Sequence, residues 1–191
     1  MKTLFIRSLT GLFFAATVIG SIVLGQIPQA FVFGLIVLIG LHEFFTHFSK
    51  NTNKKIFYSS ILTGIVAYIV LLLDSVNNSN FPFFTILPVL FLVFSAFQLW
   101  IKSSNPLQDI GQVFFAFGYL VYPMFLYVHL NNNGTEGYKE LVALFILIWT
   151  NDSLAYLTGW LFGKNKLFER ISPKKTWEGT IGGILAAILA G

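Results

Sequence analysis

Long apolar stretches separated by short polar segments dominate the sequence. Six of them predict membrane-spanning helices: Ser8–Gly25, Gln29–Phe48, Phe57–Leu73, Phe84–Ile101, Ile110–Leu130 and Lys139–Phe162. Each approaches the roughly 20 residues that a helix needs to cross a hydrocarbon core of about 30 Å. A seventh stretch begins near Gly179 and stops at Gly191, so it would rise only about 20 Å. We therefore expect an all-α, polytopic membrane helix bundle with six full transmembrane helices and a truncated seventh. It would form a single transmembrane domain over residues 1–191, incomplete at its C-terminus.

Composition supports a membrane protein. Hydrophobic residues make up 55% of the 191 residues and charged residues only 10%, with a mean hydropathy of +0.75. A soluble domain carries roughly a quarter charged residues, so an ordinary soluble globular protein is excluded. The chain has no cysteine, which excludes a disulfide framework, a thiolate metal site and a cysteine nucleophile.

The basic residues alternate along the chain. Segments 1–7, 49–56, 102–109 and 163–178 hold all the Lys and Arg residues except Lys139, and the alternate connecting segments 26–28, 74–83 and 131–138 hold none. Loops rich in Lys and Arg stay on the cytoplasmic side of a membrane. We therefore expect a multi-pass protein of the cytoplasmic (cell) membrane, with a cytoplasmic N-terminus.

A histidine pair near the end of the second stretch does not predict a zinc site. His42 and His47 are five residues apart, about 140° around a helix axis, whereas two helical zinc ligands need a spacing of four. We expect an interfacial cluster here. Glu43 lies close enough to the cytoplasmic end to meet water or a basic partner.

Asp152 is the costliest residue in the predicted spans. A carboxylate at the centre of a membrane helix costs about 2.5–3.5 kcal/mol, so a functional site is the default expectation. Ala155, Tyr156, Gly159 and Gly163 share its helix face, and the small residues would let another helix approach closely. Asp152 is therefore expected to face protein or a water-filled cavity. The alternative is a structural hydrogen bond to a neighbouring helix.

The segment 163–179 carries five basic residues. Ser172 and Pro173 predict a helix N-cap and first helical position, which would put Lys174 and Lys175 in the first turn. Cations there oppose the helix dipole, and free N–H groups beside two lysines would suit a phosphate.

Two alternatives stay open for these basic residues. Lys164 and Lys166 could equally bind anionic lipid headgroups. Cytoplasmic loops are also basic for topological reasons alone.

Residues 151–183 resemble phosphatidate cytidylyltransferases, the CDP-diacylglycerol synthase family. The resemblance lies in Asp152–Tyr156 (DSLAY) and Ser172–Gly179 (SPKKTWEG), and in the distance between them. It implies transfer of a cytidylyl group from CTP to phosphatidate, giving CDP-diacylglycerol and pyrophosphate, with Mg²⁺ as cofactor. The implied partners are CTP, phosphatidate and membrane lipids, without nucleic acid, and a homodimer is compatible with the sequence.

The resemblance also implies site residues. Lys174 and Lys175 would contact nucleotide or lipid phosphates, and Asp152 would orient a metal-bound water or a lysine. Glu178 would do likewise or pair with Lys174. The implied catalytic residues are Asp152, Lys174 and Lys175, and the implied substrate-binding residues are Ser172, Thr176, Arg170 and Glu178.

One departure from the family pattern limits this expectation. The family's C-terminal motif with metal-binding aspartates is absent, so only Asp152, Glu178 and Glu43 remain as metal ligands. We expect the main ligands beyond Gly191 and the chain alone to be inactive. The alternatives are a transporter or an ion or proton channel using Asp152, a CTP-dependent lipid kinase, and a non-catalytic membrane scaffold.

Overall fold

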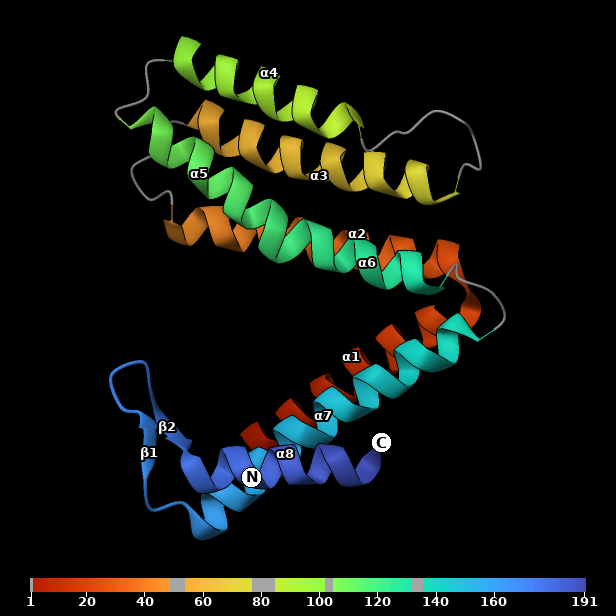
Figure 1. Ribbon diagram of the computed structural model, residues 1–191, viewed down its shortest axis with the longest axis vertical. Helices are drawn as coiled ribbons and strands as arrows, with labels where there is room; N and C mark the ends of the chain where they lie inside the picture. The colour runs from red at the N-terminus through yellow and green to blue at the C-terminus, as the bar shows by residue number, and fades with distance from the viewer. Residues whose placement is uncertain (1, 49–53, 77–84, 102–104, 132–135) are drawn as a thin grey trace. The chain divides into compact units, whose positions relative to one another are not determined.

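The structure is a computed structural model that describes residues 2–48, 54–76, 85–101, 105–131 and 136–191. Its elements in chain order are α1 (Lys2–Leu24), α2 (Gln26–Phe48), α3 (Lys54–Val76), α4 (Ile86–Trp100), α5 (Pro106–Ala116), the π-helix η2 (Phe117–Val121), α6 (Tyr122–Asn131), α7 (Gly137–Phe162), β1 (Lys166–Phe168), β2 (Ser172–Thr176) and α8 (Trp177–Ala190) (Figure 1). These elements confirm the predicted architecture of several apolar helices, though not the number of membrane spans.

Among the described residues, four helical segments are long and apolar enough to cross a membrane: Gln26–Phe48, Lys54–Ser75, Pro106–Asn131 and Gly137–Phe162. Three shorter apolar helices are Leu9–Leu24, Ile86–Trp100 and Trp177–Ala190. The count of six full spans and a truncated seventh therefore stays a prediction.

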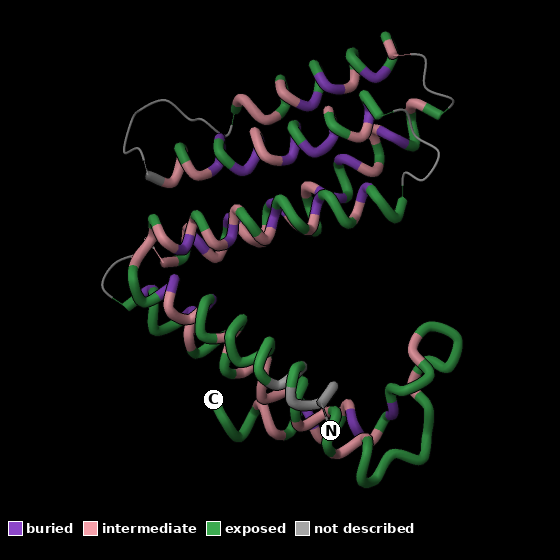
Figure 2. Tube along the Cα trace, turned by 180° about the vertical axis from the view of Figure 1, so that it is seen from behind, coloured by how far each residue is buried: buried purple, intermediate pink, exposed green. Residues whose placement is uncertain are grey.

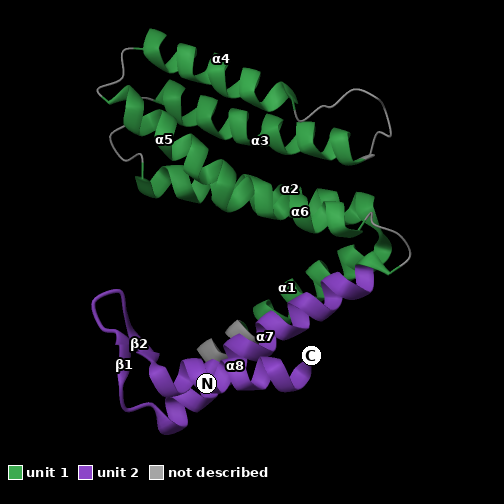
Figure 3. Ribbon diagram, in the orientation of Figure 1, with its two compact units in different colours: residues 1–137 green, residues 138–191 purple. Residues whose placement is uncertain are grey.

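The chain forms two compact units, residues 1–137 (unit 1) and 138–191 (unit 2) (Figure 3). The single transmembrane domain expected over residues 1–191 stays a prediction.

Bulky side chains hold unit 1 together. Helices α2, α3 and α6 lie side by side, and α4 and α5 pack against α3. On α2 the buried residues recur at every fourth position, the spacing of one helix face: Gln29, Phe33, Val37, Leu41 and Phe45 (Figure 2). Aromatic rings join neighbouring helices, for example Phe33 with Tyr127 at 5.9 Å between ring centroids.

A polar network closes one end of unit 1. Gly25 adopts a φ of 111°, which a side chain would strain, and lets α1 turn directly into α2. The buried Gln29 donates to the carbonyl of Tyr127 at 3.1 Å. Asn131 donates to the Gln29 side-chain oxygen at 2.6 Å and to the carbonyl of Ile22 at 3.1 Å. These hydrogen bonds tie α6 to the turn between α1 and α2.

Gln98 on α4 is a contrasting buried amide. It is fully buried on the stripe that also holds Phe91 and Phe94, and neither side-chain polar atom has a hydrogen-bond partner among the described residues. Burying such an amide without partners costs free energy.

Unit 2 consists of α7, an antiparallel hairpin of β1 and β2, and α8. The all-α expectation is therefore wrong at residues 166–168 and 172–176. The helix start expected at Ser172 is also wrong, because Ser172–Thr176 is extended and α8 begins at Trp177. The cause is non-local: the N–H of Trp177 donates to the carbonyl of Asn165 at 3.0 Å, which holds both sides of the hairpin together.

Candidate functional site

Glycines set the geometry of unit 2. A Cβ atom placed on Gly179 would lie 2.7 Å from the carbonyl oxygen of Ala155 and 3.0 Å from the Cα of Gly159. One placed on Gly183 would lie 2.7 Å from the carbonyl oxygen of Asn151. The backbones of α7 and α8 thus touch at small residues spaced four apart, as in close-packed membrane helices.

The helix pair is antiparallel. A Cβ atom placed on Gly163, just after the end of α7, would lie 2.8 Å from Thr176, just before the start of α8. Gly191, at the other end of α8, lies within reach of Leu147 on α7. The hairpin between the helices therefore extends from one end of the α7–α8 pair. The sequence-based expectation that small residues on α7 admit another helix is correct for Gly159 and Gly163.

Thr176 caps α8 in place of Ser172. Its backbone is extended, with φ of −126° and ψ of 155°, and its buried hydroxyl accepts a hydrogen bond from the N–H of Gly179 at 3.2 Å. A threonine hydroxyl bound to the third helical N–H is a standard N-cap. Thr176 is thus occupied in holding the start of α8.

Glu178 fastens the hairpin to α8. Its carboxylate accepts hydrogen bonds from the backbone N–H of Lys164 at 3.2 Å and from the backbone N–H of Asn165 at 3.2 Å. The side-chain amide of Asn165 donates to the same carboxylate at 2.8 Å. The Glu178 backbone N–H lowers the pKa of this carboxyl most, and Lys164 and Asn165 lower it further, against an opposing effect of desolvation. The alternative of a Glu178–Lys174 pair one helical turn apart fails, because Lys174 is in a strand.

These bonds also correct the expected role of the helix N-terminus. The first N–H of α8 donates to Asn165, the second lies beside the Glu178 carboxylate, and the third donates to Thr176. The helix start expected at Ser172 does not form, and the first three N–H groups of α8, the helix that does form, are engaged within the protein. These three N–H groups are therefore not free for a phosphate, and the exposed basic side chains of the hairpin are the candidate phosphate contacts.

The hairpin presents those side chains to the outside. Lys166 pairs with Thr176 and Phe168 pairs with Ser172, so β2 advances four residues where β1 advances two. The two extra residues form a bulge around Lys174, and bulges redirect side chains. The five basic residues of the segment are all exposed: Lys164, Lys166, Arg170, Lys174 and Lys175. Ser172 is half-buried at the start of β2.

Asp152 is not brought to the hairpin. It lies on α7 eleven residues before Gly163, which corresponds to about 16 Å along the helix axis. Its side chain is exposed and accepts a hydrogen bond from the Asn151 amide at 3.3 Å. The face of α7 that packs on α8 is formed by Asn151, Ala155 and Gly159. Asp152 is therefore beside this packed face, and not in a cavity between the two helices.

No preformed metal site occurs among the described residues, in that no three His, Asp or Glu side chains gather to hold an ion. Glu178 is engaged with N–H donors, and Glu43 is exposed on α2, where its carbonyl is bonded to His47. Asp152 offers a single exposed carboxylate. These residues do not by themselves fit a resident Mg²⁺.

Sequence reasoning missed two contributors to this site. Asn165 joins β1 to α8 through three hydrogen bonds, and no local pattern marks it. Thr158 donates to the carbonyl of Gly179 at 3.3 Å across the helix pair. The spacing of four between Gly179 and Gly183 was a signal available in the sequence.

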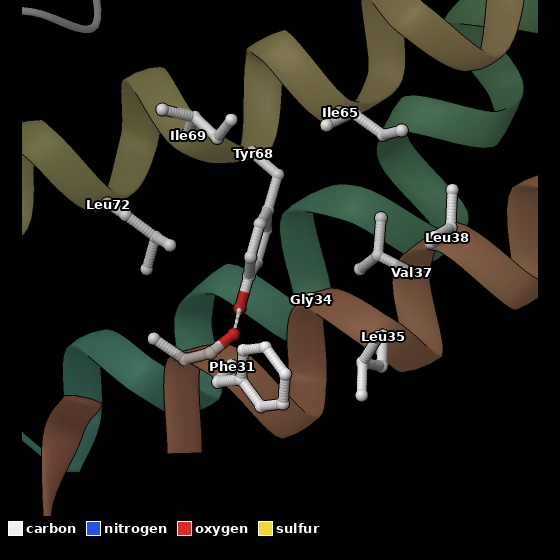
Figure 4. A pocket seen from close by; sticks show the side chains of 10 residues that line it. Phe31, Gly34, Leu35, Val37, Leu38, Ile65, Tyr68, Ile69 and Leu72 are labelled. Carbon is white, nitrogen blue, oxygen red and sulfur yellow. Dashed lines mark hydrogen bonds between the residues drawn. The ribbon is translucent and has the colours of Figure 1, made fainter. Parts of the chain in front are cut away.

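A cavity in unit 1 has a different character. It measures about 460 Å³ between α2 and α3, and its lining is apolar except for Tyr68, whose hydroxyl donates to the carbonyl of Ala30 at 3.1 Å (Figure 4). It offers no charge to a nucleotide. Of these two places, the basic hairpin is the better candidate for phosphate chemistry.

The fold and site thus define a multi-pass membrane protein with an exposed basic hairpin. Residues 5–191 match the model of the cytidylyltransferase family, and the chain belongs to that family. The family assignment made from residues 151–183 is confirmed.

Relatives that the chain matches are named phosphatidate cytidylyltransferase. The chain is 24% identical to that of Bacillus subtilis over 191 residues, which is 96% of this chain and 68% of the relative. It is 27% identical to that of Staphylococcus haemolyticus over 157 residues, covering 81% of this chain and 58% of the relative. Identity reaches 41% with the Haemophilus influenzae protein over 93 residues, covering 46% of this chain and 31% of the relative.

Proposed function

We propose that the chain takes part in cytidylyl transfer from CTP to phosphatidate, which yields CDP-diacylglycerol and pyrophosphate for phospholipid biosynthesis. The observation that carries the proposal is the exposed basic hairpin, fastened by Glu178 and Asn165 to the end of a membrane-length helix. The names of the relatives supply the choice of substrates.

The chemistry explains why such a surface suits these substrates. A phosphate oxygen of phosphatidate attacks the α-phosphorus of CTP, the bond to the β-phosphate breaks, and pyrophosphate leaves. Both reactants are anionic, and negative charge builds up on the leaving group. Fixed cations therefore lower the repulsion and stabilise the transition state.

The hairpin residues divide into two roles in this proposal. Lys174 and Lys175 act on the reacting phosphates, and Arg170 and Ser172 bind substrate phosphates. Thr176 and Glu178 position the hairpin, because their side chains hold the start of α8 and the backbone of residues 164–165. This assignment moves Thr176 and Glu178 from substrate contact to positioning.

The two substrates also indicate on which side of the membrane the hairpin lies. CTP is a soluble nucleotide and phosphatidate a bilayer lipid, so the hairpin would lie on the cytoplasmic side of the cell membrane, as the alternation of basic segments predicts. A homodimer stays part of the proposal. A catalytic role for Asp152 and a dependence on Mg²⁺ also stay predictions.

Labelled CTP tests the reaction. The chain in nanodiscs containing phosphatidate receives CTP labelled at either the α- or the γ-phosphate. If the chain catalyses the transfer, α-label enters the lipid, γ-label leaves as pyrophosphate, and Lys174→Ala reduces the transfer. Entry of γ-label into the lipid would contradict the proposal and indicate a kinase. If neither label enters, the inactivity expected for this chain alone holds, and CTP binding becomes the deciding measurement.

A further inference from the structure

The hairpin also exposes large apolar side chains. Phe168 is 62% exposed, Ile171 is 75% exposed, and Trp177 at the start of α8 is 53% exposed. Phe168 and Ile171 flank the turn and are brought together by a hydrogen bond from the N–H of Ile171 to the carbonyl of Phe168 at 3.2 Å. Exposed apolar groups gathered at one place mark an interaction surface.

Basic residues flank this apolar pair along the chain. Lys166 and Arg170 are exposed on either side of Phe168, and Lys174 and Lys175 are exposed on the paired strand. The only acidic residue from 164 to 175 is Glu169. Aromatic or aliphatic side chains set among Lys and Arg are typical of segments that lie at the surface of anionic membranes.

The position of the hairpin in unit 2 fits that surface. The 26-residue helix α7 is long and apolar enough to cross a membrane, and it ends at Phe162, directly before the hairpin. Helix α8 runs back along α7 from Thr176. Both ends of the hairpin therefore emerge at the same end of a membrane-length helix, where lipid headgroups begin.

We propose that the hairpin lies on the bilayer surface, with Phe168 and Ile171 inserted among the lipids and with Lys164 and Lys166, which the proposed reaction does not use, bound to the phosphates of anionic bilayer lipids. The occupant is the bulk anionic bilayer. The inference therefore goes beyond the proposed reaction and needs no turnover. The Phe168–Ile171 pair would keep the lysines of β2 at the depth of lipid phosphates.

The absence of cysteine makes the test direct. Single variants Phe168→Cys and Ile171→Cys carry a spin label in nanodiscs containing phosphatidylglycerol, and their accessibility to oxygen and to a water-soluble nickel chelate is measured. Glu169→Cys, between them in the turn, is the matched control. Thermal unfolding of each labelled variant, compared with the unlabelled chain, establishes that the fold is kept.

We expect the ratio of oxygen to nickel accessibility at Phe168 and Ile171 to exceed that at Glu169 severalfold. We also expect this excess to fall in nanodiscs of neutral phosphatidylcholine. Equal ratios at the three positions in anionic nanodiscs would overturn the proposal. An excess that is the same in neutral nanodiscs would overturn the role of the anionic lipids. Shielding that appears only when CTP is added would show instead that the pair closes over nucleotide.

Discussion

Units 1 and 2 are both mainly helical, yet they hold their helices together by different means. In unit 1, large side chains fill the space between helices, as Phe33 and Phe45 do on α2. In unit 2, Gly159 and Gly179 bring two backbones into contact, and hydrogen bonds fasten a hairpin to the end of the pair. Packing between large side chains tolerates small shifts of the helices, whereas contact between two backbones closely fixes the position of one helix on the other. The glycine-packed unit carries the candidate site.

The largest effect is expected from a side chain placed in the backbone contact. Gly179→Leu cannot be accommodated beside the carbonyl oxygen of Ala155, 2.7 Å from the Cβ position, so α8 must separate from α7. We expect a loss of about 3 kcal/mol in the free energy of unfolding. The measurement is reversible unfolding in detergent micelles. Gly111→Leu on α5 is the control, because nothing lies within 4 Å of its Cβ position; equal losses in the two variants would refute backbone contact as the basis of unit 2.

The two buried glutamines of unit 1 sharpen the comparison. Gln29 makes two hydrogen bonds, so Gln29→Leu should cost about 1–2 kcal/mol. Gln98 has no partner among the described residues, so Gln98→Leu should be neutral or stabilising. Reversible unfolding in detergent micelles measures the change in the free energy of unfolding for both variants. A larger loss of unfolding free energy for Gln98→Leu than for Gln29→Leu would contradict the roles assigned to the two glutamines.

A smaller effect is expected at the apolar cavity. Tyr68→Phe removes one hydrogen bond, to the carbonyl of Ala30, and keeps the ring that lines the cavity. The expected loss is about 0.6 kcal/mol, measured as above. Because the nucleotide site lies elsewhere in this account, CTP binding should not change. A loss of CTP binding in Tyr68→Phe would contradict that separation.

The smallest change in global stability is expected at Glu178, whose effect is local and depends on pH. Its pKa is lowered in the folded state, so the carboxylate stabilises the hairpin above the usual pKa of a glutamate. That stabilisation is lost as the pH falls through the folded-state pKa. We expect hydrogen exchange at the amides of Lys164 and Asn165, corrected for intrinsic rates, to speed up in acid. Glu178→Gln should remove this pH dependence, and an unchanged profile in the variant would disprove the role of the carboxylate.

Much of this organisation could be predicted from local sequence patterns. The stretch 57–73 lies within α3, and the stretch 110–130 lies within the continuous helical segment Pro106–Asn131. Apolar runs of this length have few alternatives to a helix. The glycines at 159 and 163 likewise indicated a close helix partner.

The hairpin could not be predicted in this way. Ser172 and Pro173 form a plausible helix start, but the bond between the N–H of Trp177 and the carbonyl of Asn165 places the cap at Thr176. That bond joins residues twelve apart and leaves no local signature. The position of Asp152 beside the face that packs on α8 could not be predicted either, because its packed neighbours Asn151 and Ala155 differ from it by only part of a helical turn.

In the proposed function the basic side chains of the hairpin bind nucleotide phosphates, and equilibrium binding of CTP tests this binding most directly. The double variant Lys174→Ala/Lys175→Ala is compared with Lys54→Ala/Lys55→Ala, an exposed lysine pair at the start of α3. Charge-assisted hydrogen bonds of about 1.5–3 kcal/mol correspond to a weakening of about tenfold or more for the hairpin variant. The control should bind CTP as the unchanged chain does. Equal affinity in the two double variants would contradict the account.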